Sequence, residues 1–232
     1  MGGRAETRQL AVLLEARGRM SHTRMEVIEL ARQWPYCYHI TFFANLRSIV
    51  ASRALYSATF LLSAAGLNRH CQLRTSEQSI NVWGRQVVLR NQIALNPDSL
   101  ALPESDSLED YVAFLNERTY FWPGTHEGPV ADGLRMFAAH ATSRPPITIR
   151  ARTVALIEQN QNAEILVATC NTGASWHDRD GKTWRRRDAV VPLSKYVGDP
   201  WAIAELSYRT AAQLPQGCQC SLRHFEGWEE LR

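Results

Sequence analysis

The chain has 232 residues, of which 45% are hydrophobic, and this size and composition predict one compact domain or one domain with a small appendage. The formal net charge of +3 is too small to indicate a polyanionic partner by itself, and no apolar run is long enough to cross a bilayer. No signal peptide opens the chain, and its five cysteines lack the number and spacing of a disulfide framework. We therefore expect a cytoplasmic protein with reduced thiols, no membrane association and no bound metal.

Residues 1–34 are expected to form a helical segment ahead of the main domain, which we place at residues 35–232. Thr23 and Glu26 have the spacing of a capping box and predict the start of a helix, which Pro35 would end. This first segment is better suited to packing or to contact with a partner than to chemistry.

The segment after Pro35 carries the first candidate site. Residues 36–41 alternate aromatic and β-branched side chains and predict a strand, and residues 42–50 predict an amphipathic helix. His39 and Thr41 therefore stand near a strand end, where a ligand can meet a ring nitrogen, a hydroxyl and free helical N–H groups. The alternative is that His39 is a buried histidine bonded to a neighbouring carbonyl.

A basic region follows. We expect a helix at residues 57–66, a polar loop over the cleft at residues 68–81, and a strand at residues 86–90 that ends in Arg90. A guanidinium can hold a phosphate with two hydrogen bonds and keeps its charge, although Arg90 could equally be an ordinary surface cation. The arginines of this region are Arg69, Arg74, Arg85 and Arg90.

Ser107 and Asp110 predict the capped start of a helix that runs through Glu117. The next segment, residues 119–124, reads as a strand rich in large aromatic residues, of which Phe121 is the best suited to a core.

The middle of the chain predicts a helix at residues 129–142, strands at residues 147–151 and 163–169, and a short helix or loop at residues 153–159 between the two strands. The loop after the second strand contains Gly173, which permits a positive φ, so its amides can face a ligand. The alternative is a plain turn.

The stretch at residues 176–187 combines cations with indole rings. Its candidate nucleic-acid-binding residues are Trp176, Lys182, Trp184, Arg185, Arg186 and Arg187. Neutralising phosphates while stacking bases on an indole is the physical means of holding a single strand. The alternative is a solvated loop with scattered aromatic residues.

Residues 201–209 predict a strand on which Glu205 shares one face with Ile203 and Ser207. A carboxylate is costly to bury on an apolar strand without a partner, so Glu205 is a candidate catalytic residue. The alternative is an edge-strand carboxylate that faces water.

Taken in chain order, several of these segments resemble the DarT-like ADP-ribosyltransferases and an uncharacterised group related to them. The resemblance covers about residues 25–215, and its motifs are Tyr-His-Ile-Thr from residue 38, Asn-Leu-Arg-Ser-Ile-Val from 45, Val-Leu-Arg-Asn-Gln from 88, Leu-Asn-Glu-Arg-Thr-Tyr-Phe-Trp-Pro from 115, Asn-Thr-Gly-Ala from 171 and Ala-Glu-Leu from 204. The resemblance implies an α+β fold with N-terminal helices, in which two packed, mostly antiparallel β-sheets surround an NAD cleft. It also implies an NAD-dependent mono-ADP-ribosyltransferase, a glycosyltransferase that uses NAD as a substrate.

The resemblance further implies roles for single residues. Glu205 and Arg90 would be catalytic, Glu205 by stabilising the oxocarbenium-like charge on the ribose or by accepting the proton of the attacking group. The residues that would bind NAD are His39, Thr41, Asn45, Arg90, Tyr120, Trp122 and Asn171. The order His39, Tyr120, Glu205 resembles the His–Tyr–Glu arrangement of one transferase branch.

DarT-like enzymes modify bases of single-stranded DNA, and a related phage-defence toxin modifies messenger RNA. By this resemblance we expect a toxin that modifies DNA or RNA, contacts it through residues 176–187, and is held in check by an antitoxin protein. The acceptor-loop pattern of DarT is not found, so the modified base stays open. A transferase that modifies protein and a catalytically silent module that binds NAD or nucleic acid are the alternatives. No GxGxxG follows a strand, so a Rossmann binding mode is not expected.

Overall fold

The computed structural model describes residues 22–92, 95, 102, 106–131, 133–134, 144–173, 190–223 and 225–232. Its helices are α2 (His22–Gln33), η1 (Phe43–Asn45), α3 (Leu46–Ser52), α4 (Ala58–Ala64), α5 (Leu108–Asn116), α7 (Thr153–Gln159), η4 (Leu193–Lys195) and η5 (Pro200–Ala202), where η marks a 3-10 helix. Its strands are β1 (Tyr36–Phe42), β2 (Ala54–Tyr56), β3 (Gln78–Val82), β4 (Arg85–Leu89), β5 (Arg118–Thr125), β6 (Gly128–Pro129), β7 (Pro146–Arg152), β8 (Ile165–Ala168), β9 (Val190–Pro192), β10 (Glu205–Arg209), β11 (Ala211–Gln213), β12 (Gln219–Ser221) and β13 (Glu229–Glu230).

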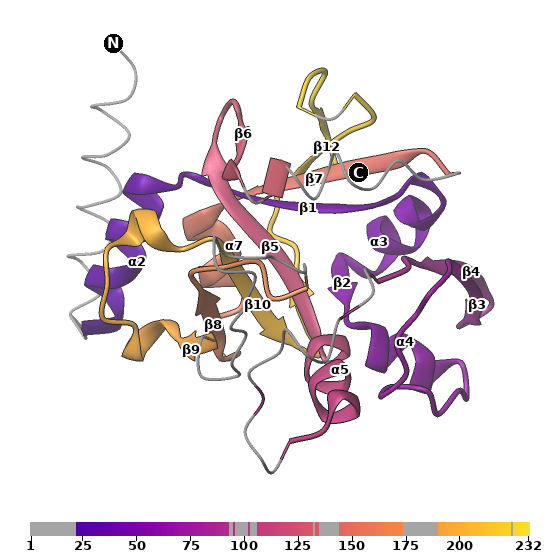
Figure 1. Ribbon diagram of the computed structural model, residues 1–232. Helices are drawn as coiled ribbons and strands as arrows, with labels where there is room; N and C mark the ends of the chain where they lie inside the picture. Colours follow the sequence, from indigo (N-terminus) through magenta and orange to yellow (C-terminus); the bar gives the residue numbers. More distant parts are fainter. Residues whose placement is uncertain are drawn as a thin grey trace.

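The centre of the fold is a nine-stranded antiparallel sheet in the order β13-β12-β7-β1-β5-β10-β8-β9, with β6 paired to β5 (Figure 1). Strand β5 joins the two parts of this sheet. Its first half pairs with β10, ending at Leu206 opposite Phe121, and its second half pairs with β1, beginning at Tyr38 opposite Trp122. The pairing partner of β5 therefore changes from β10 to β1 between Phe121 and Trp122. After Tyr38, strand β1 no longer pairs with β5.

The main core lies between this sheet and helices α2 and α7, which pack against each other. Leu30 of α2 and Leu156 of α7 are fully buried there together with Ile149 and Leu206 of the sheet. Burying such side chains is worth about 1.5–3 kcal/mol each. Helix α2 thus contributes to the same core as the strands that follow Pro35.

A smaller layer built from β2, α4 and the β3–β4 hairpin lies beside this sheet (Figure 1). Ser57 caps α4, because its hydroxyl accepts a hydrogen bond from the backbone N–H of Phe60 at 3.2 Å. Leu62 then packs against Ile80 and Val87 of the hairpin in a second apolar cluster. This packing brings the end of β4 next to the end of β1.

The α+β class and the antiparallel pairing are confirmed. The strands of the main sheet form one path through β5, while β11–β2 and β3–β4 form two further two-stranded sheets. The expected arrangement of two packed sheets around a cleft therefore stays a prediction. The helices expected at residues 57–66 and 107–117 are present, and the second begins with the capping box of Ser107 and Asp110.

Two expected elements are wrong in part. The loop expected at residues 68–81 becomes strand β3 at Gln78, where hairpin pairing with β4 satisfies the backbone. The strand expected from residue 201 begins at Glu205, because the chain before it forms η5, with Pro200 in its first turn. Most of the helix expected at residues 129–142 lies outside the described residues. In the part of the chain that the structure describes, no helix has the length and apolarity needed to cross a membrane.

Candidate active site

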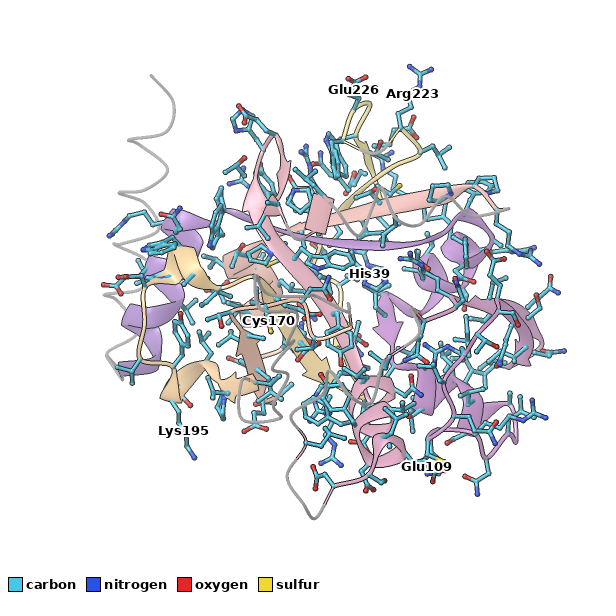
Figure 2. All side chains as sticks on the ribbon, in the orientation of Figure 1. His39, Glu109, Cys170, Lys195, Arg223 and Glu226 are labelled. Atoms are coloured by element: carbon cyan, nitrogen blue, oxygen red, sulfur yellow. The ribbon has the colours of Figure 1, made fainter. Side chains whose placement is uncertain are left out.

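Three neighbouring strands bring His39, Tyr120 and Glu205 to a single pocket with a volume of about 240 Å³. His39 comes from β1, Tyr120 from β5 and Glu205 from β10, and these strands are adjacent in the sheet. Figure 2 shows His39 near the middle of the molecule, whereas Glu109 and Lys195 lie at its edge. The sheet thus joins an imidazole and a carboxylate that are far apart in sequence.

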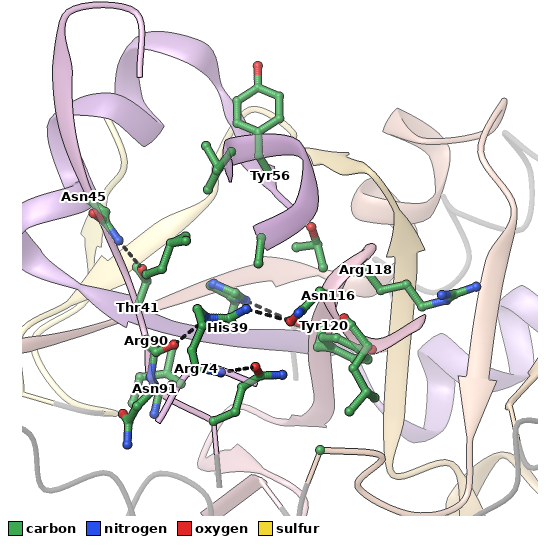
Figure 3. Close-up of a pocket in the computed structure, with 18 of the residues that line it drawn as sticks. His39, Thr41, Asn45, Tyr56, Arg74, Arg90, Asn91, Asn116, Arg118 and Tyr120 are labelled. Carbon is green, nitrogen blue, oxygen red and sulfur yellow. Dashed lines mark hydrogen bonds between the residues drawn. The ribbon is translucent and has the colours of Figure 1, made fainter. Parts of the chain in front are cut away.

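His39 sits where β1 and β5 have ceased to pair. Its Nδ1 lies 2.8 Å from the carbonyl oxygen of Tyr120, and because a carbonyl only accepts, Nδ1 carries the proton (Figure 3). Burial lowers the pKa of His39 from 6.5 to about 4, against the effect of this hydrogen bond and with a smaller contribution from the charge of Arg90. The ring is therefore neutral near pH 7, and its Nε2 is a hydrogen-bond acceptor. His39 thus bonds a backbone carbonyl and also lines a pocket, and its contact with a ligand stays a prediction.

Glu205 is 4% exposed and belongs to a strand that is paired on both sides, by β5 and β8. An edge-strand carboxylate that faces water is therefore excluded. Its Oε2 accepts hydrogen bonds from the backbone N–H of Thr172 at 2.8 Å and from the Thr172 hydroxyl at 2.9 Å. These two donors offset part of the cost of burying the acid. Burial, and after it the negative charge of Glu205, raises the pKa of Tyr120 well above its ordinary value.

Three arginines line the same pocket: Arg118, which lies 3.9 Å from the carboxylate of Glu117, and Arg74 and Arg90. Arg74 donates through Nε to the carbonyl of Arg90 at 2.9 Å and through Nη1 to Asn116 Oδ1 at 2.6 Å (Figure 3). Burial lowers the pKa of Arg74 and of Arg90 from 12.5 to about 10, so both stay charged near pH 7. Neither is in an ion pair with another described residue, and Nη2 of Arg90 is buried without a hydrogen-bond partner among them. The negative charge of Glu77 acts on Arg90 without forming an ion pair and raises its pKa against the effect of burial. The buried Nη2 of Arg90 still lacks a hydrogen-bond partner among the described residues, so this part of the pocket is suited to an anion.

Asn45 fixes the strand that leads to Arg90. Its side-chain amide donates to the carbonyl of Val88 at 2.8 Å and accepts from the Val88 N–H at 2.8 Å, as a paired strand would. The same Nδ2 also donates to the Thr41 hydroxyl at 3.0 Å. Asn45 and Thr41 both line the pocket. Their hydrogen bonds to each other and from Asn45 to Val88 give them a structural role in shaping it.

The other residues expected to bind NAD also line the pocket. Asn171 accepts from the N–H of Gly173 at 3.1 Å through Oδ1, and its buried Nδ2 has no partner among the described residues. The Tyr120 hydroxyl donates to the carbonyl of Leu115 at 3.0 Å, which fixes its ring. Trp122 packs against Ile40 in a small apolar cluster at the pocket.

The expected nucleic-acid contacts at residues 176–187 lie outside the described residues. Sequence reasoning gave no individual role to three residues of the site: Arg74, which it named only as one arginine of a basic region, Asn116 and Thr172. The Asn-Thr-Gly motif was a signal for Thr172, whereas Arg74 and Asn116 meet only because a loop folds onto the end of α5. No group of three or more His, Cys, Asp or Glu residues that could hold a metal ion occurs in the described ranges.

Comparison with known families gives one match: the profile of DUF7002, a family of unknown function, matches residues 35–213. Neither the curated proteins nor the solved structures contain a match to the chain. The matched region includes every pocket residue described above.

Proposed function

Because the chain belongs to the DUF7002 family, whose function is unknown, we propose its function from the site itself: an NAD-dependent mono-ADP-ribosyltransferase that modifies a base in single-stranded nucleic acid. One observation carries the proposal. A neutral histidine, a buried glutamate and two guanidiniums without ion-pair partners among the described residues line one pocket.

The cationic side of the pocket suits the pyrophosphate of NAD. Arg90 has an unused buried N–H donor, and Arg74 holds the Arg90 backbone in place. Arginine binds phosphate oxygens with two parallel hydrogen bonds and keeps its charge, and both guanidiniums stay charged near pH 7. The pocket volume of about 240 Å³ is below the usual range for sites that enclose a whole ligand, so the dinucleotide would be only partly enclosed.

The part of the pocket formed by His39 and Glu205 suits the ribose next to nicotinamide. Nε2 of His39 would accept a hydrogen bond from a ribose hydroxyl, because its Nδ1 already carries the proton. The bond between C1′ and the nicotinamide nitrogen breaks, and its electron pair leaves with nicotinamide. Glu205 stabilises the positive charge that develops on the ribose. A nucleophilic nitrogen of the acceptor then bonds to C1′ and loses its proton to Glu205.

An ADP-ribosyltransferase-like fold belongs to the same proposal. It is supported by the division of the sheet at β5, where the two parts diverge and the pocket residues His39, Tyr120 and Glu205 come from the three strands at this point. The sequence motifs that resemble DarT-like enzymes supply most of these pocket residues. We further propose a cytoplasmic toxin, acting in phage defence or in a toxin–antitoxin pair and restrained by an antitoxin protein.

The test uses NAD labelled in its adenylate phosphate, incubated with the full chain and with single-stranded DNA, RNA or a protein extract. Label should appear on DNA or RNA, and mass spectrometry should find the added ADP-ribose mass on a base. Glu205→Gln should lower labelling about 100-fold or more, in the range lost when a transition-state charge stabiliser is removed. Glu158→Gln makes the same chemical change at an exposed position of α7 and should retain full activity.

Three outcomes would contradict the proposal. Label on protein alone would assign a protein acceptor. Intact NAD with every acceptor would indicate a binding module without catalysis. Full labelling by Glu205→Gln would remove the carboxylate from the mechanism.

A further inference from the structure

An exposed tryptophan occupies the turn of the β3–β4 hairpin, and its placement is unusual. Val82 pairs with Arg85, so the chain reverses within the two residues Trp83 and Gly84, which have φ values of 51° and 73°. Turns of this type need positive φ at both positions and favour Asn or Asp at the first. A bulky residue there strains the backbone, and strain of this kind tends to occur at functional sites. Trp83 nevertheless keeps 56% of its surface exposed.

Two further rings support Trp83. Tyr56 and Phe60 stack at 4.8 Å with an interplanar angle of 14°, and the Trp83 ring lies 5.4 Å from Tyr56 and 5.9 Å from Phe60. We call these three residues the aromatic platform. They come from β2, α4 and the hairpin turn, so the ring of Trp83 is held in place by packing and loses little freedom when a flat ligand stacks on it.

The aromatic platform is continuous with the pocket that contains His39 and Glu205. Tyr56 lines that pocket together with Ala58 and Leu61 from the same part of the chain. Figure 3 places Tyr56 at the edge of the group, with its ring directed away from His39 and Arg90. A ligand stacked on Trp83 would therefore lie next to the pocket edge and outside its charged interior.

Two arginines, Arg85 and Arg47, bring positive charge to a groove next to the hairpin turn. Arg85 follows the turn directly and lines this groove together with Arg47 and Phe43, which is about half exposed. Neither Arg47 nor Arg85 is in an ion pair with a described residue. Arginines beside exposed rings are what a single strand needs, because phosphates take the charge and bases take the ring faces.

We infer that the aromatic platform binds a nucleobase of single-stranded nucleic acid, that Arg85 and Arg47 contact the adjoining phosphates, and that this surface delivers the acceptor strand to the pocket. The last step rests on the proposed transferase function, whereas strand binding does not. The chemistry is common to DNA and RNA, since every base offers a flat face for stacking.

The test measures binding without NAD, by fluorescence anisotropy, of a labelled 15-mer in three forms: DNA, RNA of the same sequence, and an abasic DNA backbone. Trp83→Asn removes the ring and suits the turn, so this variant should fold. It should weaken binding of the base-bearing strands about 5- to 150-fold and leave abasic binding unchanged. Trp201→Ala is the matched control, because Trp201 is 65% exposed and lies on η5, which packs against α2. Arg85→Gln should weaken all three forms and reduce their dependence on salt.

Several results would overturn the inference. Equal binding by the wild type and Trp83→Asn would do so, as would equal affinity for the abasic and the base-bearing strands. A failure to bind any strand, with a self-association in sedimentation that Trp83→Asn abolishes, would assign the platform to protein contact. Strand binding that depends on Trp83, without transfer of ADP-ribose, would refute the proposed function and leave this inference standing. The tighter of the DNA and RNA arms identifies the natural strand.

Discussion

Because His39 is neutral in the folded protein, we predict that the free energy of unfolding depends on pH, and the size of this dependence follows from the pKa of the ring. The folded protein holds the pKa of His39 at about 4, chiefly because the ring is buried, whereas the unfolded chain has the ordinary value of 6.5. Between these two pH values the unfolded chain binds a proton that the folded chain does not, so the free energy of unfolding falls as the pH falls. The full difference corresponds to about 3 kcal/mol, of which about 2 kcal/mol is lost between pH 7 and pH 5.

Urea unfolding at pH 7 and pH 5 measures this loss. His39→Gln keeps an amide N–H that can reach the Tyr120 carbonyl and removes the titrating ring, so it should lose about 2 kcal/mol less than the wild type over this interval. His126→Gln replaces an exposed histidine in the turn between β5 and β6, and it should follow the wild type.

Nitrogen NMR shifts of the imidazole add an independent check, because they report which ring nitrogen carries the proton. Equal losses by the wild type and His39→Gln, or a proton on Nε2 at pH 7, would refute the neutral acceptor and with it the ribose contact proposed for His39.

Three further predictions concern the residues around this ring. Asn45→Ala removes the hydrogen bonds that fix β4 and should destabilise the protein by about 2–3 kcal/mol in urea unfolding, with an unchanged stability contradicting its role. Thr172→Val removes one of the two donors to Glu205 and should slow ADP-ribose transfer about 10-fold, whereas Thr172→Ser should restore the rate; a slow Ser variant would show that the hydroxyl is not what matters. Arg90→Lys should raise the Kd for NAD about 10-fold in calorimetry, because an ammonium cannot bind phosphate with two parallel N–H groups.

The sequence predicted those parts of the site that leave a local signal. Glu205 stands out because an acid between apolar strand residues needs a partner, and the structure supplies one in Thr172. Helix starts were also readable, since Ser107 and Asp110 satisfy each other's backbone N–H groups within one turn of chain. Such features depend on residues a few positions apart, and sequence spacing reports them directly.

The rest of the site depends on contacts that sequence spacing does not report. Arg74 lies in the pocket because it donates a hydrogen bond to Asn116 at the end of α5, and Asn116 in turn donates to the carbonyl of His70. These residues are far apart in sequence. Asn45 pairs with the backbone of Val88, which no side-chain pattern reveals. Strand β3 is a different case. Ile80 and Val82 are buried and their neighbours are exposed, so its period-two pattern was present but lay in a polar stretch that suggested a loop.

The division of the sheet explains why the pocket forms where it does. Where β1 leaves β5, the carbonyl of Tyr120 loses a partner strand, and the imidazole of His39 takes its place. The ring is thereby fixed with its acceptor nitrogen available, while Arg90 and Asn171 retain buried N–H donors that no described residue satisfies. The pocket thus offers hydrogen-bond acceptors from His39 and Glu205 and unused donors from Arg90 and Asn171, and a ligand that carries hydroxyl groups and anionic oxygens together matches both. A simple anion satisfies the donors and a plain sugar satisfies the acceptors, whereas a sugar joined to phosphate satisfies both sets, and we favour a nucleotide ligand for this reason.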